Sequence, residues 1–171
     1  EELYARTAQA EDAARAVPGI TNSEGADAGW GRSTVALVTS GGFAAAYSGT
    51  SHSVSASVIA GEGTGMERDY DYSSVRFVKD LEDAATIGRQ AGERAVKRLN
   101  PRKVKSGPAP VIFDPRVSNG LLGHLAGAIN GASVARGTSF LRDKMNEKIF
   151  ADGIVIVDDP HRKTGLASRP F

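Results

Sequence analysis

Few residues in this chain combine the types and spacing that chemistry at a protein site requires. The histidines are His52, His124 and His161, which lie too far apart in sequence to form a local metal-binding motif. The 171 residues contain no cysteine, which excludes disulfides and iron–sulfur ligation among them. The residues alone therefore predict no catalytic group and no bound metal in this chain.

Three common signatures of enzymes are incomplete. The segment Gly137–Leu141 lacks the second glycine that the sharp turn of a nucleophile elbow needs. No glycine-rich phosphate loop precedes Lys163-Thr164. The glycines within Gly61–Gly65 have the wrong spacing for a dinucleotide fingerprint, and no helix is expected after them. The sequence therefore does not favour these enzyme classes.

The most informative segment is Pro110–Phe140, in which an apolar strand at Val111–Phe113 and a proline turn precede a helix rich in Gly and Ala. Each Gly costs about 0.8–1 kcal/mol against Ala in a helix, so such a helix needs close tertiary contact. We expect it to be buried, with Ser118 as its N-cap and its end at Arg136-Gly137. Helical spacing places an apolar stripe and a glycine stripe on it: Leu121, Leu125, Ile129 and Ala132, and Gly123, Gly127 and Gly131.

The stretch DPRVSNGLLGHLAGAINGASVARGTSFLRDK from Asp114, followed by GIVIVDDP and LASRPF, resembles the TldD/PmbA family. Three upstream stretches are also similar to its PmbA (TldE) branch as found in alphaproteobacteria: VPGITNSEGADAGWGRS from Val17, GTSHSVSASVIAGEG from Gly49 and MERDYDYSS from Met66. Relatives are longer at both ends, and this chain opens inside a helical pattern without an initiator methionine. We therefore expect it to be an internal fragment.

The resemblance implies a complex of two subunits, of which only one binds the catalytic metal. The TldD-type subunit carries a helical H-E-x-x-x-H motif that holds zinc, and the pair hydrolyses unfolded or small peptides. When the motif is aligned with this chain residue by residue, Gly123 occupies the position of its first His, His124 that of its Glu and Ala128 that of its second His. Because Gly and Ala side chains offer no metal ligand and no general base, the resemblance implies a subunit with no cofactor of its own. For His124 we expect a hydrogen-bonded side chain at a packed interface, which the sequence favours over a displaced metal ligand.

The same resemblance implies partners and a biological role. A TldD-like paralogue would supply the zinc, and the substrates would be peptides in maturation or in the degradation of antitoxin-like proteins, in the cytoplasm. The isolated chain would be able to form homo-oligomers, and would not be catalytic alone. The degenerate motif also permits an alternative, a non-enzymatic protein-binding modulator of DNA gyrase. A self-sufficient hydrolase with an unrecognised site is a third alternative that the sequence does not favour.

One strand has the pattern of a peptide-binding edge. Exposed strand edges can pair with an extended peptide through backbone groups whatever the peptide's sequence. The alternative, which the sequence favours, is an ordinary strand with one charged and solvated face. The candidate residues alternate with Glu67, Asp69 and Asp71, and are Met66, Arg68, Tyr70 and Tyr72. Likewise, a turn with a local salt bridge is favoured over a ligand site for Asp114 and Arg116.

Charge and composition argue against two kinds of partner. With 21 Lys and Arg against 20 Asp and Glu, the chain lacks the cationic excess of a nucleic-acid surface, so we expect no direct nucleic-acid contact. The short basic cluster Arg102–Lys105 lies in the Pro/Gly-rich connection PRKVKSGPAP and is interpreted as a solvated linker. The apolar run of the glycine-rich helix, about 15 residues, is shorter than the roughly 20 that a membrane span needs.

Periodicity predicts the α+β class, with an antiparallel sheet meander flanked by helices and then a strand–glycine-rich helix–strand unit. Residues 1–100 are expected to form the first part, 101–109 a linker and 110–171 the start of the family's central or C-terminal region. Within the sheet, Val54, Ala56 and Val58 should be buried, since they alternate with serines. The other expected elements are helices at Glu1–Val17 and Asp83–Asn100, strands at Trp30–Ser40, Phe43–Ala60 and Gly153–Val157, and a turn at Gly41-Gly42.

Overall fold

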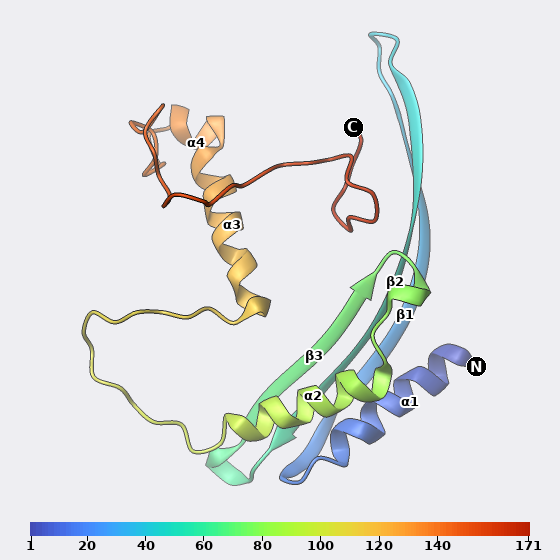
Figure 1. Ribbon diagram of the computed structural model, residues 1–171. Coiled ribbons are helices and arrows are strands. Elements are labelled where there is room, and N and C mark those ends of the chain that lie inside the picture. The colour runs from blue at the N-terminus through green and yellow to red at the C-terminus, as the bar shows by residue number, and fades with distance from the viewer. The chain divides into compact units, whose positions relative to one another are not determined.

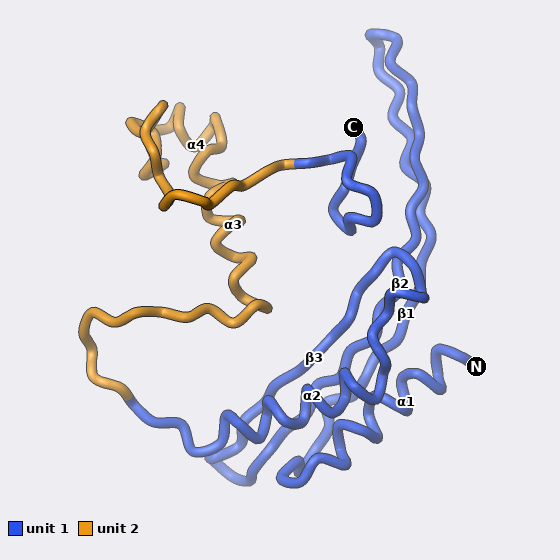
Figure 2. Tube along the Cα trace, in the orientation of Figure 1, with its two compact units in different colours: residues 1–103, 159–171 blue, residues 104–158 orange.

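The computed structural model describes residues 1–171, which form two compact units (Figure 2). The first unit contains residues 1–103 and 159–171, and the second contains residues 104–158. The first unit is built on a three-stranded antiparallel sheet with two helices packed on it (Figure 1). This architecture confirms the predicted α+β class. None of the helices has the length and apolarity that a membrane crossing requires.

The sheet has the order β1-β2-β3, with β2 (Ala44–Ala60) between β1 (Ile20–Val38) and β3 (Glu67–Val75). The predicted turn at Gly41-Gly42 is confirmed, because Thr39 N–H donates to Phe43 C=O at 2.9 Å and Gly42 has φ +87°. The expectation that β1 begins at Trp30 is wrong, since the strand starts at Ile20. Its polar, glycine-containing first half is held in the sheet by pairing with the buried half of β2, with register shifts between Ile20 and Asn22 and between Ser23 and Gly25.

Helices α1 (Glu2–Arg15) and α2 (Ala84–Lys97) cover one face of this sheet side by side (Figure 1). Asp83 caps α2, because its carboxylate accepts a hydrogen bond from Thr86 N–H at 3.0 Å. The predicted inward faces of β2 and α2 are confirmed by burial. The core consists of Ala10, Ala14, Val54, Ala56, Val58, Ala60, Ala84, Ile87, Ala91 and Ala95. Short 3₁₀ turns at Gly63–Gly65 and Val78–Asp80 flank β3.

Two glycines of α2 allow the helices to approach closely. A Cβ atom at Gly88 would lie 2.0 Å from the carbonyl oxygen of Ala10, and one at Gly92 would lie 2.7 Å from Cγ2 of Val17. Both distances are far below van der Waals contact. Glycine-mediated helix contact, which the sequence suggested for the later helix, therefore occurs between α1 and α2.

Beyond β3, strands β1 and β2 continue alone as a two-stranded hairpin, seen at the top of Figure 1. The last β2–β3 pair is His52 with Val75, whereas β1 and β2 remain paired as far as Val38 with Ala44. We call residues 33–49 the arm. Residues 159–171 lie against the arm, where the ring of Phe171 is 5.2 Å from that of Tyr47 in an edge-on arrangement. Val35 of β1 and Tyr47 of β2 line one pocket together with Phe171.

The second unit contains α3 (Pro115–Ile129) and the short α4 (Gly131–Ala135), and its other residues form turns and irregular structure. The prediction that Ser118 caps α3 is wrong. Asp114 is the cap, since its carboxylate accepts from Arg116 N–H at 2.9 Å and Pro115 takes the first helical position. The expected Asp114–Arg116 salt bridge is present at 3.2 Å. The chain leaves the second helix at Arg136-Gly137, as predicted.

Asn130 interrupts the glycine-rich helix. Its extended backbone (φ −62°, ψ 125°) ends α3, and its side chain accepts a hydrogen bond from Ala132 N–H at 2.9 Å to begin α4. The sequence suggested one continuous helix because the helical spacing of Leu125, Ile129 and Ala132 continues across Asn130. The side-chain bond to the backbone two residues on stabilises a break at this position.

Three predictions for the second unit are wrong within this chain. The glycine-rich helix is not buried, since Leu121 is 51% exposed and Ile129 61% exposed. The segments Val111–Phe113 and Gly153–Val157 are not strands, and Ile112 and Val155 are 97% and 82% exposed. A strand exists only when a neighbour pairs with its backbone, and no segment of this chain provides one here.

Candidate functional site

The positions of the degenerate metal motif lie on α3. Gly123 and His124 are exposed, and Ala128 is buried with its carbonyl accepting a hydrogen bond from Ser139 Oγ at 2.6 Å. The expectation of a hydrogen-bonded His124 at a packed interface is wrong within this chain, because its imidazole makes no hydrogen bond. The reason is that no other element covers this part of the helix, and a Cβ at Gly123 would meet nothing within 4 Å.

The donor set on α3 does not fit a zinc ion. A hydrolytic zinc site needs about three protein ligands from imidazole, carboxylate or thiolate, with an acid or base beside the bound water. Of Gly123, His124 and Ala128, only His124 carries a donor side chain. No group of three His, Cys, Asp or Glu side chains that could hold a metal ion occurs in the structure. Gly123 and Ala128 therefore offer no ligand atoms for a zinc ion at these positions of α3.

The candidate peptide-binding edge lies on a strand and not on a helix. It belongs to β3, which is an outer strand of the sheet. Tyr70 and Tyr72 are 47% and 48% exposed on the face opposite the helices, and their rings stack at 6.2 Å with an interplanar angle of 23°. Met66, just before the strand, is 54% exposed. The structure thus places three of the four predicted residues on one open apolar strip along a strand edge.

The expectation that the charged face of β3 is solvated is wrong. Asp69 and Asp71 are each only 6% exposed, because they point toward α2. Arg94 Nη1 lies 2.5 Å from the Asp71 carboxylate, and Arg98 Nη1 lies 3.7 Å from that of Asp69. Buried carboxylates require such cations and hydrogen bonds. Each carboxylate also accepts from the next backbone N–H, that of Tyr70 or Tyr72 (2.8 and 3.0 Å).

Arg68, the fourth predicted residue, forms an ion pair across the open face of the sheet. Its guanidinium lies 3.3 Å from the carboxylate of Glu24 on β1, which also accepts a hydrogen bond from Ser57 Oγ on β2 at 2.7 Å. The Ser57 hydrogen bond, with a smaller contribution from Arg68, lowers the pKa of Glu24 below its usual value. Glu24 therefore links side chains of all three strands through its contacts with Ser57 and Arg68.

This network predicts a measurable titration change. Replacing Ser57 by Ala removes the largest cause of the lowered pKa, so the pKa of Glu24 should rise toward its usual value. Because the folded-state pKa is lowered, the carboxylate contributes stability above its unfolded pKa and loses it as pH falls through the folded value. The measurement is an NMR titration of the Glu24 carboxyl carbon. Ser55→Ala on the same face is the control, and an equal shift in that variant would contradict the assignment.

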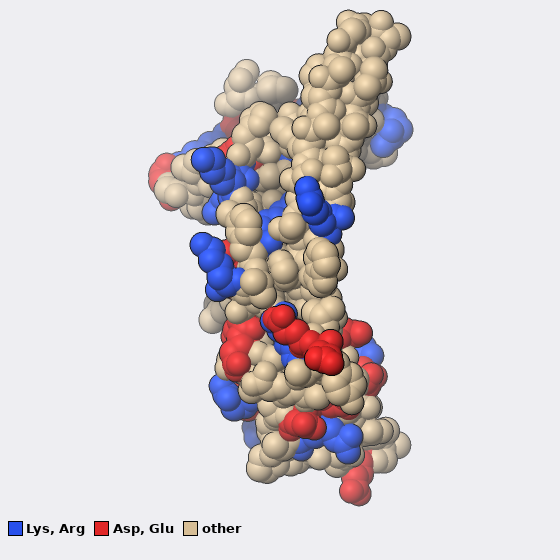
Figure 3. Space-filling view, turned by 90° about the vertical axis from the view of Figure 1, so that its right-hand side faces the viewer, with Lys and Arg blue, Asp and Glu red and all other residues tan.

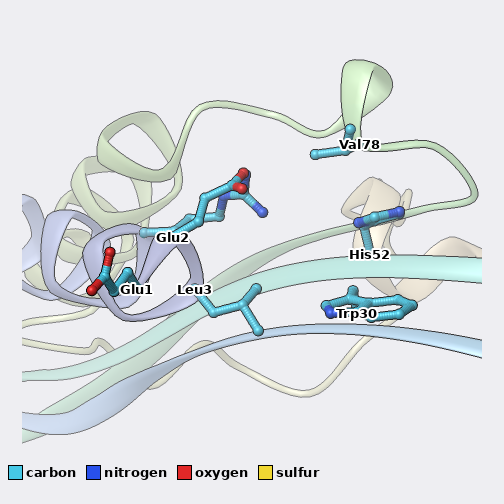
Figure 4. A pocket seen from close by; sticks show the side chains of 7 residues that line it. Glu1, Glu2, Leu3, Trp30, His52 and Val78 are labelled. Atoms are coloured by element: carbon cyan, nitrogen blue, oxygen red, sulfur yellow. The ribbon is translucent and has the colours of Figure 1, made fainter.

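A separate pocket of about 450 Å³ lies between the start of α1 and the sheet (Figure 4). Trp30 and His52, which are directly paired across β1 and β2, both border it together with Leu3. The His52 imidazole makes no hydrogen bond, and the Glu2 carboxylate is occupied by Arg6 at 2.8 Å. The pocket therefore holds no paired acid and base. Its only sequence signal is that Trp30 and His52 each interrupt a run of small residues.

Comparisons with known proteins match nearly the whole chain. Residues 1–99 match the family model described as the PmbA/TldA metallopeptidase central domain. Residues 106–171 match the model described as the PmbA/TldA metallopeptidase C-terminal domain. The join between the two models falls within the irregular connection after α2.

Curated relatives carry the same family name. The metalloprotease PmbA of Escherichia coli O157:H7 is 42% identical over 99% of this chain and 37% of its own length. A PmbA homologue of Haemophilus influenzae is 36% identical over 95% of this chain and 36% of its own length. The chain thus spans little more than a third of these relatives.

A solved structure has the same fold. The Thermotoga maritima protein, described as a candidate modulator of a DNA gyrase, superimposes with a TM-score of 0.87 over 99% of this chain and 39% of its own, at 20% identity. Matching family models, relatives and fold establish that this chain belongs to the PmbA/TldD metallopeptidase family.

Proposed function

We propose that this chain is part of the metal-free, PmbA/TldE-type subunit of a cytoplasmic peptidase that acts on unfolded or small peptides. The proposal rests on one observation: the chain belongs to a metallopeptidase family, but the side chains at the motif positions do not form a zinc-ligand set. A chain that belongs to a metallopeptidase family presents Gly123, His124 and Ala128 where zinc ligands and base are expected. The chemistry would then come from a paralogue with an intact motif, in peptide maturation or antitoxin degradation.

The β3 edge would be this subunit's contribution to substrate binding. An unfolded peptide aligned along β3 would gain backbone hydrogen bonds that do not depend on its sequence. Its alternate side chains would lie beside the stacked rings of Tyr70 and Tyr72, which face away from the helices. Binding of this kind selects for an extended backbone more than for particular side chains, as a peptidase with many unfolded substrates needs.

This role predicts a loss of peptide binding in a tyrosine variant. Tyr70→Ser with Tyr72→Ser should weaken the binding of a fluorescently labelled unfolded peptide about tenfold, because two aromatic contacts of up to roughly 1 kcal/mol are removed. Fluorescence anisotropy with the purified complex measures the change. Tyr4→Ser on α1, where the side chain is 80% exposed, is the matched control. Equal affinities for the two variants would exclude β3 as the peptide edge.

The subunit arrangement can be tested by purification from native cells. The complete gene product should copurify with a zinc-bearing paralogue in fixed ratio, and the zinc should follow the paralogue when the subunits are separated. Peptide hydrolysis should require both subunits and should stop when zinc is chelated. Hydrolysis by the isolated gene product that survives chelation would contradict the proposal.

A second candidate function is a non-enzymatic modulator of DNA gyrase, in line with the description of the Thermotoga maritima protein of the same fold. It accounts equally well for the missing zinc ligands. The same purification separates the two functions. Recovery of a stable complex with gyrase and without a zinc-bearing paralogue would favour the modulator.

A further inference from the structure

Residues 159–171, which we call the strap, pack on the arm without forming a helix or a strand. They match the family's C-terminal domain, whereas the sheet matches its central domain. The strap is folded on itself by local turns, since Ser168 Oγ donates to the carbonyl of Arg162 at 2.8 Å and Ser168 N–H donates to that of Gly165 at 3.3 Å. These turns hold the strap together but do not attach it to the sheet.

The attachment is made by Arg76, the residue directly after β3. Its guanidinium donates to the carbonyl of Gly165 from Nε and Nη2, at 3.2 and 3.1 Å, and to that of Leu166 from Nη2, at 2.6 Å. No residue of β1 or β2 makes a hydrogen bond to the strap. Because hydrogen bonds from a charged donor are roughly twice as strong as neutral ones, this one side chain supplies the polar attachment.

The same guanidinium is also fixed to β2. Nη1 donates to the carbonyl of Thr50 at 3.1 Å, and Thr50 Oγ1 donates in return to the carbonyl of Arg76 at 2.6 Å. The neighbouring stretch from Ser33 to Gly61 contains no Lys, Arg, Asp or Glu, and the end of the arm at the top of Figure 3 shows no charged side chain. With no carboxylate there to compete for it, the planar guanidinium bridges backbone carbonyls of two segments.

Apolar packing contributes less to the attachment. Leu166 is 48% exposed, and two pockets of about 390 and 500 Å³ remain beside the strap, both lined by Arg76. The ring of Phe171 contacts that of Phe43, 5.6 Å away, as well as that of Tyr47, but is itself 37% exposed. Because open space surrounds the strap, few atoms would lose van der Waals contact if it left the sheet.

We infer that Arg76 is a latch that holds the strap on the sheet, and that the strap detaches as one piece while the sheet stays folded. No residue of the strap belongs to the buried core, so detachment removes no core contact. The latch joins the family's central domain to part of its C-terminal domain. The inference is independent of the proposed function, because neither a substrate nor a paralogue takes part in the contact.

Gly49 provides a selective way to open the latch. A Cβ atom at this position would lie 2.8 Å from Nη1 of Arg76, so the guanidinium occupies space that only a glycine leaves open. Gly49→Ala should displace the guanidinium, which is the far end of a flexible side chain, and should leave the strands unstrained. Gly31→Ala on β1 is the matched control, because its Cβ would lie 3.5 Å from Ser51 Oγ, an ordinary contact.

The absence of cysteine in residues 1–171 allows spin labels to report where the strap lies. In the complete gene product, with any cysteine elsewhere replaced by serine, labels are attached at Ser53→Cys on β2 and Ala167→Cys in the strap, both exposed positions. Pulsed double electron–electron resonance should give one narrow distance between the labels. Gly49→Ala and Arg76→Met should each reduce the fraction of molecules at that distance at least threefold, and Gly31→Ala should leave it unchanged.

Two further measurements separate opening of the latch from unfolding. Urea denaturation should give the same midpoint for Gly49→Ala and Gly31→Ala, because the latch lies outside the core. The double variant Gly49→Ala with Arg76→Met should be no more open than Arg76→Met alone, since both substitutions act on one contact.

Three results would overturn the inference. An unchanged distance in both Gly49→Ala and Arg76→Met would show that other contacts hold the strap. Release of the strap by Phe171→Ala but not by Arg76→Met would assign the attachment to the aromatic contact. A urea midpoint that falls in Gly49→Ala together with loss of the narrow distance would show that the strap unfolds with the sheet and is not a separate piece.

Discussion

Gly88→Ala should be the most destabilising single-methyl substitution in this chain. The added Cβ would lie 2.0 Å from the carbonyl oxygen of Ala10, and both groups belong to helix backbones that cannot move independently. Helices α1 and α2 would have to separate, and overpacking of this kind costs about 1–3 kcal/mol or more. We expect the free energy of unfolding to fall by about 3 kcal/mol, even though alanine favours a helix by roughly 1 kcal/mol over glycine.

Gly123→Ala provides the matched control for this substitution. It makes the same chemical change inside α3, where the new Cβ would meet nothing within 4 Å. It should leave the first unit unaffected and slightly increase helix content. Urea denaturation followed by the fluorescence of Trp30, which lies in the first unit, measures both variants. A loss of less than about 0.5 kcal/mol for Gly88→Ala would show that the close helix contact is absent.

Arg94→Met should produce the second large effect, because it leaves the Asp71 carboxylate buried without its nearest cation. Asp71 is 6% exposed, and Arg94 Nη1 lies 2.5 Å from its carboxylate. Breaking a fully buried pair costs about 3–5 kcal/mol, and the Arg94 side chain is 30% exposed, so we expect about 2–3 kcal/mol. Urea denaturation at neutral pH gives the free energy of unfolding.

Two further variants distinguish the ion pair from a general effect on α2. Arg89→Met removes an exposed arginine from the same helix and should change stability by less than about 0.5 kcal/mol. Adding Asp71→Leu to Arg94→Met removes the unpaired charge and should recover most of the lost stability. A double variant as unstable as Arg94→Met alone would mean that packing of the arginine stem, not charge pairing, is the cause.

Sequence patterns predicted the elements whose side chains alternate between core and solvent. The period of two in Val54, Ala56 and Val58 and the helical spacing of Ile87, Ala91 and Ala95 correspond to residues that are buried in the structure. These patterns suffice because burial of one face follows directly from secondary-structure geometry. The family resemblance likewise rested on local sequence and is confirmed by the matched family models.

The candidate site was only partly predictable. The alternation along β3 separated Tyr70 and Tyr72 from Asp69 and Asp71, and that separation is present in the structure. Which of the two faces is covered could not be read from alternation, because both faces are equally regular. The arginines of α2 and its C-terminal end decide it, by neutralising the buried carboxylates from a distant part of the chain.

By itself, the sequence determined the family, the α+β class and the hairpin turn, because each depends on residue type or local spacing. Only the tertiary structure decided which glycines bring helices together, which face of β3 is buried and where β1 begins. These features depend on contacts between residues distant in sequence. A glycine or an aspartate has the same local pattern whether another element covers it or not.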